Sequence, residues 1–144
     1  GWAAAQRSLI TALTRVKSYV DTGPWLAVQQ AGAYALDHAD RLMAPNVVEL
    51  ARRRDAGVGA LREAGFACES PSATMYLWVP LPAEIASAEF GRRALEEQGV
   101  VVLPGSAFGA GGEGFFRIAL TVGPDRLREG VRRLGQILRS SRAA

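Results

Sequence analysis

Runs of β-type residues occur only in the second part of this 144-residue chain. The first run is Met75–Val79, which Pro80 and Pro82 end, the second is Val100–Leu103, and the third is Phe115–Val122. β-Branched and aromatic residues in short runs of this kind favour strands. Because the second run is apolar at every position, we expect it to be the central strand of a sheet, buried on both faces.

Apolar residues at helical spacing fill much of the remaining sequence. They predict five helices, at residues 9–20, 25–36, 46–64, 87–98 and 124–138. We expect Asn46 to cap the third helix, Gly65 to end it, Ser87 to cap the fourth, and Pro124 to occupy the first turn of the last.

Residues 1–44 are therefore predicted to be helices without a sheet, and residues from about 66 to 144 to form an α+β unit. Because the first part has little to pack against, we expect its helices to expose apolar faces. The chain opens with Gly1 and no initiator Met, so it is expected to be a piece of something longer. Its 49% apolar and 22% charged residues are typical of a globular protein, which argues against disorder. No apolar run reaches the ~20 residues of a membrane span.

Several motifs have an ordinary structural explanation. Gly109–Gly114 spells G-x-G-x-x-G, but a strand and not a helix is predicted after it, so we interpret it as a connection and not as a dinucleotide site. His38 and Cys68 are the only residues of their types, so neither a metal cluster nor an internal disulfide is predicted. The arginines at 52–54 and 132–133 have acidic neighbours and are interpreted as solvated helix faces, with no nucleic-acid partner.

Arg117 is the only charged residue between Phe115 and Val122. Strand alternation places it on one face with Phe115 and Ala119. Buried arginine is rare unless an anion pairs with it, and its planar fork suits a carboxylate. The alternative is an edge strand that uses the charge to discourage pairing with other chains. The residues alone leave these two interpretations even.

Two further segments are ambiguous in the same way. Pro104–Gly109 leaves a predicted strand through a tight turn, so it either lines a site or is only a turn. Tyr19 and Trp25 flank the break at residues 21–24 and could present aromatic surface, but core packing is the default expectation.

Six segments taken together, in their order and spacing, resemble the C-terminal part of class I/II aminotransferases. These are the fold-type I pyridoxal-phosphate enzymes, and the similarity is to the branch with diaminopimelate and alanine-type transaminases. The segments are Gly1–Ala3, Lys17–Tyr19 with Thr22–Pro24 and Gln29, Arg53–Asp55, Ala73–Trp78, Val102–Gly109 and Phe116–Ala119.

The resemblance implies a fold and site roles. The fold class is α/β, with residues 45–144 as the α+β small domain and residues 1–44 as helices from the end of the large cofactor-binding domain. Arg117 matches the arginine that grips the substrate α-carboxylate. Gly105, Ser106 and Phe108 match a segment that lines the site. Tyr19 lies in a segment similar to one that approaches the partner subunit's cofactor phosphate.

The resemblance also implies an activity for the complete enzyme. That enzyme would transfer an amino group between an amino acid and a 2-oxo acid in amino acid biosynthesis. It would use pyridoxal 5'-phosphate as a cytoplasmic homodimer, with no nucleic-acid or membrane partner. The family's Schiff-base lysine precedes the position of Gly1, so no catalytic residue is expected in this segment, and the segment alone is expected to be inactive. The alternative is a non-catalytic α+β module that binds a small carboxylate ligand or a partner protein.

Overall fold

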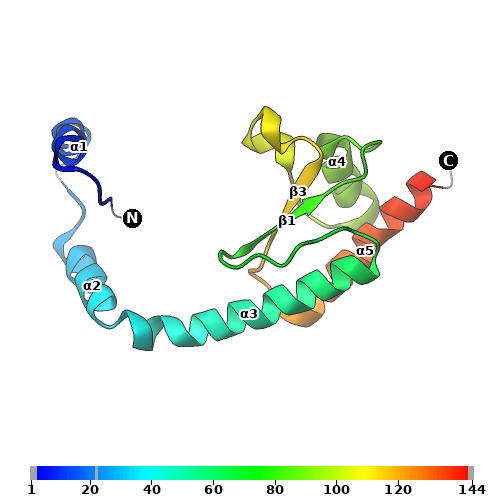
Figure 1. The fold of residues 1–144 in the computed structure, drawn as a ribbon, viewed down its shortest axis with the longest axis horizontal. Helices are drawn as coiled ribbons and strands as arrows, with labels where there is room; N and C mark the ends of the chain where they lie inside the picture. The colour runs from blue at the N-terminus through cyan, green and yellow to red at the C-terminus, as the bar shows by residue number, and fades with distance from the viewer. Residues whose placement is uncertain (1–2, 22, 143–144) are drawn as a thin grey trace. The chain divides into compact units, whose positions relative to one another are not determined.

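The computed structural model describes residues 3–21 and 23–142, which divide into two compact units, one up to Ala44 and one from Pro45 onward. The first unit contains α1 (Arg7–Val20), α2 (Leu26–Asp37) and the start of α3 (Ala39–Glu63) (Figure 1). Neither α1 nor α2 has a buried residue. Apolar side chains such as Leu9 and Val20 are 60% and 76% exposed, which confirms the expected apolar faces.

The second unit contains a small antiparallel sheet with the strand order β1-β3-β2. On the central strand, Arg117 lies opposite Trp78 of β1 on one side and Leu103 of β2 on the other. The elements after α3 are β1 (Tyr76–Pro80), α4 (Ser87–Gln98), β2 (Leu103–Pro104), the 3-10 turns η1 (Gly105–Phe108) and η2 (Ala110–Gly112), β3 (Phe115–Ala119) and α5 (Pro124–Arg142).

The expectation that Val100–Leu103 forms the central strand is wrong. Only Leu103 and Pro104 are in strand β2, which lies at an edge, and Val101 is 77% exposed. The physical reason is Pro104, because a proline has no backbone N–H and is confined to edge strands. The central position belongs to β3 instead.

The predicted start of the third helix at Asn46 is also wrong, because α3 begins at Ala39 and continues through Pro45. Proline inside a helix removes one backbone hydrogen bond, a loss that this 25-residue helix tolerates. The predicted end is confirmed. Gly65 has a φ of 93°, and the N–H of Phe66 donates to the carbonyl of Leu61 at 2.9 Å, the six-to-one bond of a left-handed helix end.

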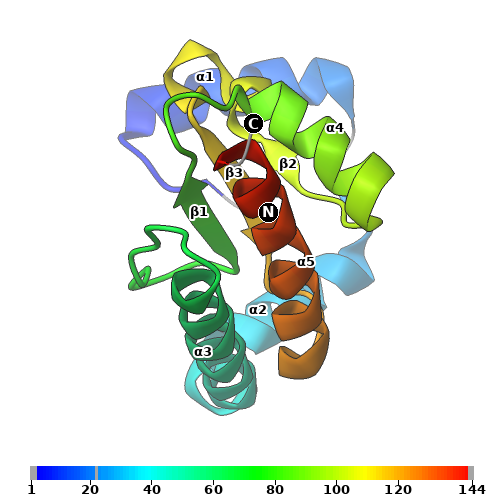
Figure 2. The ribbon, with the colours of Figure 1, turned by 90° about the vertical axis from the view of Figure 1, so that its right-hand side faces the viewer.

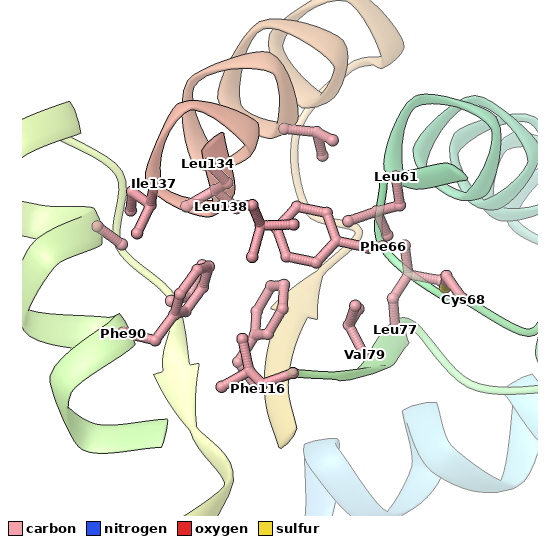
Figure 3. Close-up of a cluster of buried hydrophobic side chains, with 14 of the residues drawn as sticks. Leu61, Phe66, Cys68, Leu77, Val79, Phe90, Phe116, Leu134, Ile137 and Leu138 are labelled. Carbon is pink, nitrogen blue, oxygen red and sulfur yellow. The ribbon is translucent and has the colours of Figure 1, made fainter. Parts of the chain in front are cut away.

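Helices α3, α4 and α5 of the second unit pack on one face of its sheet (Figure 2). Leu77 and Phe116 point from the strands toward Leu61 and Phe90 of these helices (Figure 3). The ring centroids of Phe90 and Phe116 are 4.6 Å apart. The predicted core stripe of the last helix is confirmed, with five buried side chains: Leu127, Val131, Leu134, Ile137 and Leu138. In the described part of the chain, no helix is both long and apolar enough to cross a bilayer.

Candidate functional site

The sheet face opposite the helices carries a cation among aromatic rings. Phe116 on β3 is fully buried in the core, so the pleat turns its neighbours Phe115 and Arg117 to the other face. Tyr76 and Trp78 of β1 share that face, because they alternate with buried core residues and Trp78 pairs directly with Arg117. The predicted alternation is confirmed, and the edge-strand explanation for Arg117 is wrong because β3 is central.

Two rings cover the Arg117 guanidinium. Its Cζ atom lies 4.1 Å from the ring centroid of Tyr76 and 4.4 Å from that of Phe108. Both distances are well inside the ~6 Å range of a cation–π contact. The side chain is half-buried, and no carboxylate among the described residues forms an ion pair with it. The arrangement therefore offers an anion a cation that has no carboxylate partner among the residues the structure describes.

Trp78 connects these rings to the rest of the face. Its ring centroid lies 5.7 Å from that of Phe108 in an edge-to-face contact and 5.5 Å from that of Phe115 in a stacked one. Tyr76, Trp78 and Phe115 also border a groove of about 840 Å³ that extends to Cys68. Burial raises the pKa of the Cys68 thiol, so the protonated, less nucleophilic form is favoured there.

Tyr76 and Trp78 were not among the site residues predicted from the sequence. The sequence signal for them is the alternation along the strand Tyr76–Pro80, in which Tyr76 and Trp78 alternate with the apolar Leu77 and Val79. Once this strand is paired with that of Arg117, Tyr76 and Trp78 lie on the same face as Arg117. That pairing is antiparallel between segments almost forty residues apart, and no local pattern specifies it.

Gly105 and Gly112 bring the two 3-10 turns into backbone contact. A Cβ atom on Gly105 would lie 1.9 Å from the carbonyl oxygen of Gly112, and one on Gly112 would lie 2.0 Å from the carbonyl oxygen of Gly105. Only glycine fits at either position. The motif Gly109–Gly114 thus has a packing role, and β3 follows it, so the prediction that it does not have the context of a dinucleotide-binding loop is confirmed.

Ser106 ties the same turn to the start of α4. Its N–H donates to Ser87 Oγ at 3.2 Å, and the two hydroxyl oxygens are 2.9 Å apart. The Ser87 hydroxyl donates to Glu113 Oε2 at 2.9 Å, and the Ser87 N–H donates to Glu113 Oε1 at 2.7 Å. The pKa of Glu113 is lowered mainly by the hydrogen bond from the backbone N–H of Ser87, and next by the bond from the backbone N–H of Gly114. Ser106 therefore fixes the turn that carries Phe108.

Ser87 does not cap α4 as predicted. It is the first helical residue, and Ala86 occupies the cap position without a side-chain hydrogen bond. Glu113 supplies the missing acceptor from another segment of the chain, and its negative charge suits the positive end of the helix.

Tyr19 lies in the first unit, with a side chain that is 88% exposed, and Trp25 is 77% exposed. The default expectation that these two rings pack in a core is therefore wrong. A role for Tyr19 near a cofactor phosphate stays a prediction. The arginine clusters are ion-paired on helix faces, as expected: Arg52 and Arg53 pair with Glu49.

Comparison with known proteins shows the family to which the chain belongs. The model of the family described as aminotransferase class I and II matches residues 1–134. The chain is 41% identical over 138 residues to LL-diaminopimelate aminotransferase of Moorella thermoacetica, covering 96% of this chain and 35% of that protein. It is 44% identical over 138 residues to LL-diaminopimelate aminotransferase of Nitratidesulfovibrio vulgaris (strain DSM 19637 / Miyazaki F), covering 95% and 36%.

Solved structures agree. An aromatic aminotransferase from Pyrococcus horikoshii superimposes with a TM-score of 0.86 at 28% identity, over 98% of this chain and 39% of that one. A probable N-succinyldiaminopimelate aminotransferase from Thermus thermophilus gives 0.80 at 34% identity, over 88% and 34%. The fold is therefore that of fold-type I aminotransferases. The chain belongs to the aminotransferase class I and II family, and it spans about a third of the length of the curated relatives it matches.

This family is in general pyridoxal-phosphate-dependent, but the described residues do not fit a site for that group. Lys17 is the only lysine, and its Nζ atom donates to both carboxylate oxygens of Asp21, at 2.9 and 2.7 Å. A lysine that bonds covalently to a cofactor must offer an amine that is free to attack. The Arg117 guanidinium, by contrast, has the chemistry to bind a carboxylate.

Proposed function

We propose that this chain is the C-terminal segment of a pyridoxal-phosphate-dependent aminotransferase, in which Arg117 binds the α-carboxylate of the substrate. The observation that carries the proposal is the Arg117 guanidinium on the central strand, covered by two rings and paired with no carboxylate of the described chain. Membership of the family supports the reaction class, the transfer of an amino group between an amino acid and a 2-oxo acid.

The contribution of this chain is to bind and orient the substrate. Two N–H groups of Arg117 would donate to the two carboxylate oxygens, a bidentate pair that fixes the plane of the carboxylate as well as its position. In the complete enzyme, a bound cofactor would supply an electron sink for the chemistry at the α-carbon. Holding the carboxylate would fix the orientation of the substrate's α-carbon in the site, which is a positioning effect on the rate.

The remaining predicted site residues take supporting roles in this proposal. Phe108 lines the site beside the guanidinium, while Gly105 and Ser106 hold the turn that presents it. Their support is the cation–π contact of Phe108, the backbone contact of Gly105, and the hydrogen bonds of Ser106 to Ser87.

We assign residues 1–44 to the end of the large domain and residues 45–144 to the small domain of that enzyme. The apolar faces of α1 and α2 would be covered by the rest of the large domain and by a second subunit, in a cytoplasmic homodimer where Tyr19 approaches the partner's cofactor phosphate. The exposure of Leu9, Val16 and Leu26, between 60% and 69%, supports such a cover.

The test is turnover by the complete enzyme with Arg117→Ala, screened with several amino donors and 2-oxo acid acceptors. LL-diaminopimelate comes first among the donors, because the relatives named above act on it by name. Removing one partner of a buried charge pair costs about 2–5 kcal/mol. We therefore expect kcat/KM to fall by roughly thirtyfold or more, since each 1.4 kcal/mol is about a factor of ten.

Arg126→Ala is the matched control, because Arg126 is an exposed arginine on α5 of the same unit. It should leave kcat/KM near the wild-type value. Wild-type turnover in Arg117→Ala would refute the proposal. Carboxylate binding without amino transfer by the wild type would favour the alternative, a non-catalytic carboxylate-binding module.

A further inference from the structure

We propose that Tyr76 and Phe108 are positioning residues, which hold the Arg117 guanidinium in place for a carboxylate without an internal counter-charge. This inference rests on the proposed function, because it concerns how the same arginine is prepared for its ligand. The two rings come from different elements, Tyr76 from β1 and Phe108 from η1, and both lie within 4.4 Å of Arg117 Cζ.

The problem that the rings solve is the mobility of an arginine side chain. A long side chain of this kind carries about 2 kcal/mol of rotamer entropy, which binding would otherwise have to overcome. Eight arginines in the described part of the chain are ion-paired with a carboxylate and lose that freedom to it. Arg92, for example, is bonded to Glu89 and Glu96, and Arg132 to Glu129. Arg117 has no such partner among residues 3–21 and 23–142 and is held by rings instead.

A ring and a carboxylate restrain a guanidinium in different ways. A carboxylate accepts hydrogen bonds from the N–H groups, so an incoming substrate would have to displace it. The face of a ring attracts the charge through its quadrupole and leaves the N–H donors at the edge of the guanidinium plane available. Arg117 is therefore restrained while its hydrogen-bonding capacity for a ligand is kept.

The position of Phe108 is itself fixed by the surrounding structure. Its ring meets Trp78 edge-to-face at 5.7 Å, and its turn is fixed by the contact of Gly105 with Gly112 and by the bonds of Ser106 to Ser87. Phe108 is nevertheless 50% exposed. A half-exposed ring contributes little to the core, so the role that this geometry gives Phe108 is its contact with the guanidinium.

The experiment uses the complete enzyme and compares Phe108→Leu and Tyr76→Leu with Phe108→Tyr and Tyr76→Phe. The leucine variants keep an apolar side chain without a ring face, and the other two keep the ring. Phe115→Leu is the control, because Phe115 lies on the same sheet face and stacks on Trp78. The readouts are KM for the amino acid, kcat, and the inhibition constant of a carboxylate analogue that lacks the amino group.

We expect each leucine variant to raise KM and the inhibition constant by about twofold to thirtyfold, the range that a lost cation–π contact gives, with kcat changed less. The ring-keeping variants and Phe115→Leu should stay within about twofold of wild type, the lower end of that range. In an Arg117→Ala background, Phe108→Leu should have no further effect on either constant, because the ring acts through the arginine.

The outcomes separate this inference from the function on which it rests. Unchanged kinetics in Arg117→Ala alone would refute the proposed function. If Arg117→Ala is impaired but Phe108→Leu and Tyr76→Leu bind carboxylates like Phe115→Leu, the two rings do not position the arginine. Equal effects of Phe108→Leu with and without Arg117 would likewise overturn the inference, because they would show a general structural role.

Discussion

Replacing Gly105 with alanine tests the packing that underlies the site. The new Cβ atom would lie 1.9 Å from the carbonyl oxygen of Gly112 and 2.7 Å from that of Phe115. The first distance is about 1.1 Å shorter than the 3.0 Å below which real Cβ contacts essentially do not occur. Both clashing atoms are backbone, so the conflict cannot be relieved by rotating a side chain.

The cost follows from the rigidity of those partners. Inserting a methylene group into a well-packed region costs about 1–3 kcal/mol, and sometimes more. Because a backbone turn must move here, we expect a loss of about 3 kcal/mol from the free energy of unfolding, at the upper end of that range. For a unit of about 100 residues, such as residues 45–144, this lowers Tm by roughly 12–24 °C.

The assay is urea unfolding of the protein followed by far-UV circular dichroism, with Gly111→Ala as the control. A Cβ atom on Gly111 would meet no atom within 4 Å, so this variant should stay within about 0.5 kcal/mol of wild type. Gly112→Ala should resemble Gly105→Ala, and the double variant should cost less than the sum because both disturb one contact. Equal unfolding midpoints for Gly105→Ala and Gly111→Ala would refute this reasoning.

Two further predictions concern charged groups. Hydrogen bonds from Ser87 and Gly114 lower the pKa of Glu113 in the folded protein. The ionised carboxylate therefore stabilises the fold above the pKa that Glu113 has in the unfolded chain, and this stabilisation is lost as pH falls through its lower pKa in the folded protein. The stability difference between wild type and Glu113→Gln in urea titrations should therefore shrink on acidification from pH 6. This 144-residue chain mixed with pyridoxal phosphate should show no lysine-dependent absorbance band after gel filtration, because Lys17 is paired with Asp21. A band that survives in the wild type and vanishes in Lys17→Arg would contradict that expectation.

The parts of the fold that the sequence predicts well are those with local causes. Gly65 and Gly99 end their helices at φ values of 93° and 64°, as glycine after an apolar helical stripe should. Pro124 begins α5 as expected. Each of these features depends on a few consecutive residues, so its energetics can be judged without knowing the tertiary structure.

The errors arise where distant segments compete with a local signal. Asn46 has the side chain of a helix cap, yet the helix continues through it from Ala39, so tertiary context overrides capping preference. Val100–Leu103 is apolar enough for a central strand, but the order of the sheet depends on which segment pairs on both sides. Strand pairing depends on contacts between distant segments, and here Phe115–Ala119 pairs on both sides and is the central strand.

The candidate site shows the same division. Arg117 is identifiable from its own strand, as one charge in an apolar run, and strand alternation gives its face. Its partners are not, because Tyr76 and Phe108 reach it only through the pairing of β1 with β3 and the fold of η1. The resemblance to a family supplied Phe108, but neither the resemblance nor the sequence pattern supplied Tyr76.

A continuous set of contacts connects the glycine-rich turn, the start of α4 and Arg117. Glu113 and Ser106 both bond to Ser87, so they fix the turn on the first residue of α4. The turn η1, which contains Ser106, ends in Phe108, whose ring contacts the Arg117 guanidinium. A disturbance at Glu113 should therefore reach the Arg117 guanidinium through these contacts, although Glu113 itself does not bond to Arg117. Under the proposed role of Arg117, substitutions in this loop should raise KM for the amino acid before they lower kcat, which is the opposite of what a direct role in proton transfer would produce.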